Sequence, residues 1–65
     1  MYIVIELQAS DGKVASIVTN YTDHEEAQSK FHQIMAAAAV SSVSCHSAVI
    51  LDETGMSLRQ ESYTH

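Results

Sequence analysis

Hydrophobic and polar residues alternate in four short segments of the chain and recur at helical spacing in one longer segment between them. The first segment, 2–8, has a period of two and is rich in β-branched residues, which is typical of a strand. Asp11-Gly12 follows it. Because both central residues of a tight type I′ turn need positive φ, this pair predicts a hairpin whose second strand covers 13–20.

The longer segment predicts a helix over 23–39. Thr22 and Glu25 fit a capping box, in which the threonine hydroxyl and the glutamate satisfy free backbone amides at the helix start. Acidic residues also crowd the first turn, where the helix dipole favours negative charge. A single apolar stripe follows at helical spacing. Its members are Ala27, Phe31, Ile34, Met35 and Ala38.

The remaining pattern predicts a second hairpin. One strand covers 44–51, a turn with Gly55 in a left-handed conformation covers 52–55, and the last strand covers 56–63. In that last strand Met56 and Leu58 are expected inward, and Arg59 outward. The predicted fold is therefore α+β with the order ββαββ: one domain over 1–65, with a four-stranded antiparallel sheet of two hairpins and one helix packed on one face.

One helix can cover only one face of such a sheet, yet both faces contain apolar residues. The face expected to remain open contains Tyr2, Val4, Ile17 or Val18, Ala48, Ile50 and Tyr63. A homodimer or a larger assembly would cover it, by packing of open faces, pairing of edge strands or exchange of hairpins. The alternative is a twisted sheet with a few exposed apolar residues.

The leading hypothesis is consequently a non-enzymatic protein-interaction module that acts as a homodimer or assembly subunit. Its predicted anchor residues are Tyr2, Val4, Ile17, Ile50 and Tyr63.

Composition and charge narrow the choice of partner. The chain has 65 residues and a net charge of −5, with only three basic residues, all far apart in the sequence. Binding to nucleic acid through phosphate contacts is therefore not expected, nor is binding to an anionic membrane. A basic partner is electrostatically allowed, which gives a second hypothesis: an acidic inhibitor or decoy of a nucleic-acid-binding protein. No secretory signal or membrane-spanning run is recognisable, so a cytoplasmic location is expected.

Candidate chemistry is sparse. Cys45 is the only cysteine and the chain has four histidines. A third hypothesis is a small metal-binding protein that uses His32, Cys45 and His46. Because Cys45 and His46 are neighbours in a predicted strand and point to opposite sides, the fold would have to assemble any such site. A catalytic Cys45 would need a nearby base and an oxyanion site, and no glycine-rich loop or sharp turn accompanies it. We therefore expect no enzyme activity and no cofactor.

Three segments together resemble a family of short uncharacterised bacterial proteins. They are Tyr2-Ile-Val-Ile-Glu-Leu-Gln8, Ala36-Ala-Ala-Ala-Val-Ser-Ser-Val43 and His46-Ser-Ala-Val49. The resemblance covers most of the chain and implies a bacterial cytoplasmic origin. It implies no activity, ligand or site residue.

Overall fold

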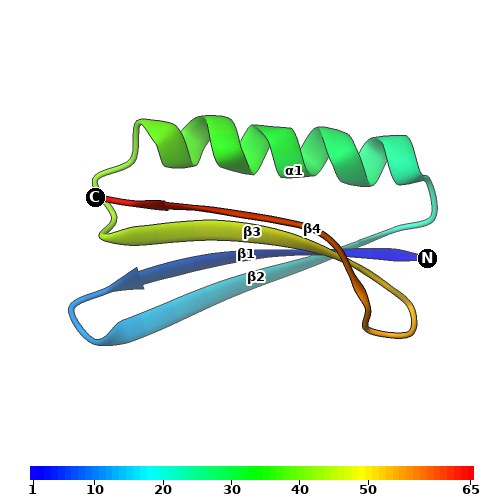
Figure 1. Cartoon of the computed structure of the whole chain (residues 1–65), viewed down its shortest axis with the longest axis horizontal. Coiled ribbons are helices and arrows are strands. Elements are labelled where there is room, and N and C mark those ends of the chain that lie inside the picture. Colours follow the sequence, from blue (N-terminus) through cyan, green and yellow to red (C-terminus); the bar gives the residue numbers. More distant parts are fainter.

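The predicted order of elements is confirmed. In the computed structural model, which describes all residues 1–65, the elements are β1 (Tyr2–Ser10), β2 (Lys13–Tyr21), α1 (His24–Ala39), β3 (Cys45–Asp52) and β4 (Ser57–Thr64). α1 lies along one side of the sheet, and no element lies on the other side (Figure 1). No helix is both long and apolar enough to cross a membrane.

The strands form one antiparallel sheet in the order β2-β1-β3-β4. The two hairpins therefore lie side by side through β1 and β3, and α1 connects the edge strand β2 to the central strand β3. β1 pairs with β2 and with β3 over nearly its whole length, from Tyr2 opposite Tyr21 and Asp52 to Ala9 opposite Val14 and Cys45. This order leaves β2 and β4 as edge strands.

Both hairpin turns have the backbone that their sequences predict. Asp11 and Gly12 have φ values of 55° and 76°, as a two-residue turn of the primed type requires. Gly55 has φ of 88°, a left-handed conformation that a β-carbon would strain. Register is therefore set locally in both hairpins.

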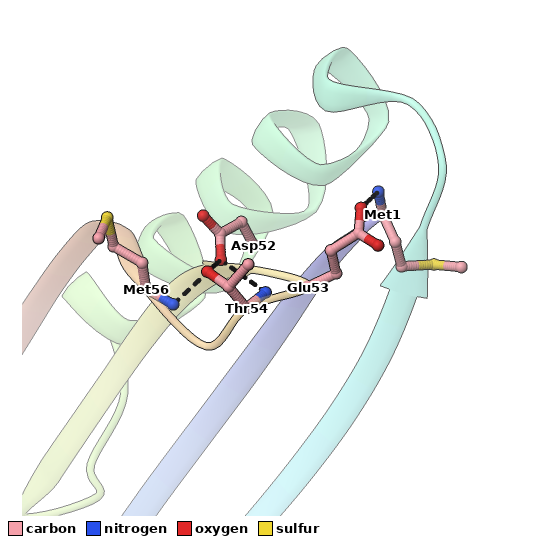
Figure 2. Close-up of polar contacts among 5 residues, drawn as sticks. All are labelled: Met1, Asp52, Glu53, Thr54 and Met56. Atoms are coloured by element: carbon pink, nitrogen blue, oxygen red, sulfur yellow. Dashed lines mark hydrogen bonds and ion pairs between the residues drawn. The ribbon is translucent and has the colours of Figure 1, made fainter.

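The second turn is also held by the Asp52 carboxylate (Figure 2). Its Oδ1 accepts hydrogen bonds from the backbone N–H of Thr54 at 2.9 Å and of Met56 at 3.0 Å, and from the Thr54 hydroxyl. The neighbouring Glu53 Oε1 lies 3.4 Å from the amino group of Met1. The hydrogen bonds from Thr54 and Met56 hold the pKa of the Asp52 carboxyl below its ordinary value of 3.8.

Replacing Asp52 with alanine should lower the melting temperature at neutral pH. A carboxyl whose pKa is lowered by folding stabilises the fold above its unfolded pKa, and this contribution is lost as the pH falls through the lower, folded value. The difference from the wild type should therefore shrink at pH values below 3.8. Thermal melting followed by circular dichroism at both pH values checks this. Glu53→Ala, next in the chain, removes only a surface ion pair and should change melting little.

The helix start differs by one residue from the prediction. Asp23, not Thr22, is the N-cap: its Oδ1 accepts the N–H of Glu25 at 3.0 Å, and the predicted capping box does not form. Both residue types are good N-caps. β2 continues to Tyr21, one residue further than predicted, and the cap falls one residue later as well. The acidic first turn, with Glu25 and Glu26, is as expected.

The core lies between α1 and the sheet. All five residues of the predicted helix stripe are buried, which confirms that stripe. They pack against three buried residues of the central strands, with Tyr2 and Tyr21 at the margin. Those three are Val4, Ala48 and Ile50.

This core overturns the predicted assignment of sheet faces. The sequence predicts Val4 and Ile50 on the open face, but each is only 1% exposed and lies beneath the helix. The same reversal applies to β4, where Arg59 is on the helix side and its guanidinium lies 4.9 Å from the centre of the Phe31 ring. Met56 and Leu58, expected inward, are both exposed. The last residue is held as well, since the His65 backbone N–H donates to the Ser44 carbonyl at 2.8 Å.

Candidate functional site

The main candidate site is the sheet face that α1 leaves uncovered, which we call the open face. Successive residues of a strand point to opposite sides, so the register assigns each paired strand residue to one face. Its apolar residues come from three adjacent strands: Ile3, Ile5, Leu7 and Ala9 of β1, Val14 and Val18 of β2, and Cys45, Val49 and Leu51 of β3. Its other residues are Ser16, Asn20, Ser47, Ser57, Gln60, Ser62 and Thr64.

The open face contains no charged residue. Every charged strand residue falls on the helix side instead, by the same register. These residues are Glu6, Lys13, Asp52, Arg59 and Glu61. A sheet face that remains in water normally has charged or strongly polar residues, and the covered face is the apolar one. The open face therefore lacks the charged residues that a solvated sheet face normally has.

Apolar exposure on the open face is high. Leu7, at the centre of the sheet, is 36% exposed, and the two β2 valines are 58% and 69% exposed. A shallow hollow between β1, β3 and β4 includes Leu7, Ser47 and Val49 in its lining. Contiguous exposed apolar residues of this kind mark interaction surfaces more often than isolated ones do.

The five anchors expected from the sequence all lie on the opposite, helix-side face. Val4 and Ile50 are core residues, and Tyr2 packs at the core margin with its ring 5.0 Å from that of His24. Ile17 and Tyr63 are exposed, but on the helix side, at the two edges of the sheet. The expectation of an uncovered apolar face is confirmed, whereas its residues were assigned to the wrong side.

The helix-side layer also contains a polar cluster that the sequence did not reveal. Nε2 of His46 lies 2.7 Å from Oε2 of Glu6, and Nε2 of Gln8 donates to the same oxygen at 3.0 Å. His46 is only 4% exposed, and its Nδ1 has no hydrogen-bond partner. The two partners are 40 residues apart, so only the pairing of β1 with β3 brings them together.

The cluster keeps the Glu6 carboxyl ionised despite its burial. Burial by itself raises the pKa of this group, but hydrogen bonds from His46 and Gln8 and the nearby charges of His46 and Lys30 outweigh it. The net result is a pKa below the ordinary 4.5. The pair is therefore a structural ion pair or charge-assisted hydrogen bond inside the small core.

The fold does not bring His32, Cys45 and His46 together. His46 points toward the helix side and Cys45 toward the open face, as alternation along β3 predicted, while His32 is exposed on α1. No group of three or more histidine, cysteine, aspartate or glutamate side chains is arranged to hold a metal ion. The structure thus lends no support to the metal-binding hypothesis.

α1 begins at the same end of the molecule as the turn from β3 to β4 (Figure 1), and both segments contain carboxylates. Three of them already have local roles. Asp23 caps α1, Asp52 holds its turn, and Glu53 pairs with the Met1 amino group. These roles account for the acidic end without a basic partner, and the inhibitor or decoy hypothesis stays a prediction.

The chain matches no protein-family model, no curated protein and no solved structure. Its resemblance to short bacterial proteins therefore stays a prediction, and function has to be inferred from the fold and its surfaces.

Proposed function

We propose that this chain is a small, non-enzymatic interaction module that associates with a second copy of itself through the open face. The observation that carries the proposal is the separation of charge and apolar surface across the sheet. Each molecule has a net charge of −5, which opposes association. Packing two open faces brings no charged side chain into the contact and leaves the acidic residues in water.

The size of the face suits this role. Strand residues rise about 3.3 Å each and strands lie about 4.8 Å apart, so four strands of eight or nine residues present a face of roughly 30 by 18 Å. Pleated side chains add accessible area to this projection. The result approaches the roughly 800 Å² per partner that specific interfaces bury. Two such faces pack about 10 Å apart, as in a β-sandwich.

Association would also supply stability that a single copy of this size lacks. A domain this small buries only about 60% of the surface of its unfolded chain. It has no disulfide, since Cys45 is the only cysteine and is free, which suits the reducing cytoplasm that we propose as its location. Burying the open-face side chains would add hydrophobic stabilisation of about 25 cal/mol per Å² of apolar surface.

Leu7→Lys should abolish the open-face association. It places a charge at the centre of the open face without touching the core beneath α1, so the variant should fold and have at most half the sedimentation mass of the wild type. Val40→Lys is the matched control: it makes the same chemical change at a residue that is 87% exposed just beyond α1 and away from the sheet.

Sedimentation equilibrium at micromolar concentration, with circular dichroism to verify folding, measures the outcome. The wild type and Val40→Lys should both be heavier than a monomer, and added salt should not dissociate them because no ion pair holds the interface. A monomeric wild type, or a Leu7→Lys variant as heavy as the wild type, would contradict the use of this face.

A further inference from the structure

β2 is an edge strand whose outward backbone groups can be identified. The His65 N–H donates to the Ser44 carbonyl, and this bond identifies which residues of β3 and β4 form the hydrogen-bonded pairs. In antiparallel strands successive residues direct their N–H and C=O groups to alternate neighbouring strands. The pairing registers therefore show which residues of β3 bond to β1, which residues of β1 bond to β2, and which residues of β2 point outward. The outward groups of β2 are therefore those of Val14, Ser16, Val18 and Asn20.

This edge lacks the features that usually prevent strands from pairing. β2 has nine residues, no proline and one charged residue, Lys13, at its very start. Its partner strand β1 pairs with it without a bulge. The other edge is different: β4 has Arg59 and Glu61 near its middle, and a register shift interrupts its pairing at Ile50 and Leu51. Charges and bulges protect edges, so β2 is the open one.

Packing of two open faces does not account for the exposure of Ile17. It is 53% exposed, yet it lies at the middle of β2 on the helix side, where a partner on the open face cannot reach it. α1 does not cover it, and a recess separates the helix from β2 further along, lined by Tyr21, Glu26, Ser29, Lys30 and Gln33. A neighbour that approaches along the sheet edge could cover this side chain.

We propose that β2 pairs antiparallel with β2 of a second copy, with the two-fold axis at Ile17. In this register each Ile17 lies opposite its equivalent in a non-hydrogen-bonded pair, where side chains approach most closely. The outward residues then pair as Val14 with Asn20 and Ser16 with Val18, twice each by symmetry. Every outward N–H and C=O of β2 gains a partner.

The same register introduces no charge repulsion between the paired strands. Lys13 is the only charged residue of β2, and it lies opposite Tyr21 of the second copy. Tyr21 lines the recess beside α1 together with Glu26 and Lys30. No charged side chain of β2 lies opposite a like charge. The second copy is therefore a better occupant of this edge than an arbitrary extended peptide, because β2 is complementary to itself.

The edge contact is separate from the proposed open-face contact and compatible with it. Antiparallel pairing keeps both helices on one side, so the sheet continues through eight strands and the two open faces join into one. If both contacts form, two such sheets pack face to face and the assembly contains four copies. If only the edge forms, the assembly contains two.

Ser16→Pro tests the edge, because it removes an outward N–H and leaves the bonds to β1 in place. Ser62→Pro is the matched control, since Ser62 is an outward-facing residue of β4 by the same phase. Ser16→Pro should halve the sedimentation mass, whereas Ser62→Pro should leave it unchanged. A second variant, Ile17→Lys, should also halve the mass.

Combination with Leu7→Lys separates the two proposals. If Leu7→Lys halves the mass and adding Ser16→Pro yields a monomer, both contacts exist. If Leu7→Lys leaves the mass unchanged and Ser16→Pro halves it, the edge proposal stands and the open-face proposal fails. If Ser16→Pro and Ile17→Lys both keep the wild-type mass, the edge proposal is overturned.

Amide hydrogen exchange of the wild type gives a readout that does not depend on any variant. The outward amides of Val14, Ser16, Val18 and Asn20 should exchange at least tenfold more slowly than those of Gln60 and Ser62, the corresponding residues of the other edge. Equal, fast exchange at both edges would overturn the proposal.

Discussion

Phe31→Ala should unfold the isolated chain. Phe31 is fully buried at the centre of α1 and packs in the same cluster as Val4 and Ile50, with the Arg59 guanidinium over its ring. Replacing a buried phenylalanine by alanine costs about 3–5 kcal/mol. A single core of this size rarely supplies more than roughly 3–5 kcal/mol in total. The two quantities are equal in scale, so the variant has no stability left.

Circular dichroism and urea titration measure this effect. The protein concentration is kept fixed and low, because association would stabilise the fold as the concentration rises. The wild type should show a cooperative transition and Phe31→Ala none. Val40→Ala, which truncates an exposed side chain, should remain within about 0.5 kcal/mol of the wild type. A cooperative Phe31→Ala variant with a transition midpoint near that of the wild type would show that the core is not centred on this ring.

Glu6→Ala should have the second largest effect, a loss of about 2–3 kcal/mol at neutral pH. Nδ1 of His46 already has no partner, and removal of Glu6 leaves Nε2 without its acceptor as well. A buried polar group left unsatisfied costs about 1–3 kcal/mol, and breaking a buried ion pair costs more. Glu61→Ala is the matched control, because this half-exposed glutamate on the same face makes only a surface ion pair with Arg59.

The pH dependence of this effect follows from the lowered pKa of Glu6. Such a group stabilises the fold above its unfolded pKa, and the contribution disappears as the pH falls through the lower, folded value. The stability difference between the wild type and Glu6→Ala should therefore shrink at pH values below 4.5. Urea titrations at neutral pH and in acid test both points. A Glu6→Ala variant no less stable than Glu61→Ala would rule out a structural role for the pair.

A double variant tests whether the Glu6–His46 pair contributes net stability, or whether stability is lost only when one partner is removed and the other stays buried. Glu6→Leu with His46→Leu replaces both partners by apolar side chains. Such replacements of buried pairs are often neutral or stabilising. We expect the double variant to be at least as stable as the wild type, and clearly more stable than Glu6→Ala.

Local patterns predicted the elements well because their causes are local. The Asp11-Gly12 turn sets the first hairpin, and the helix stripe from Ala27 to Ala38 identifies the buried side of α1 without knowledge of the sheet. The assignment of sheet faces failed because β1 is apolar on both sides. Which side receives α1 depends on Ala48 and Ile50 of β3, which become neighbours of β1 only through the strand order.

The His46–Glu6 pair was missed for a similar reason. Glu6 makes the helix side of β1 look unsuited to burial, because the sequence does not show that His46 of β3 lies within hydrogen-bond distance of its carboxylate. The sequence contains no local signal for a contact across 40 residues. The sequence thus predicted that an uncovered apolar sheet face exists. The residues of that face could be assigned only from the pairing of β1 with β3.

The absence of charge on the open face gives a single copy two chemically different sides. At low concentration such a copy is an amphiphile: it should adsorb to an apolar resin, or to an air–water interface, with the open face toward the apolar phase and α1 in the water. Its retention on that resin should rise with ammonium sulfate, because this salt strengthens apolar contacts and no charged strand residue lies on the adsorbing side.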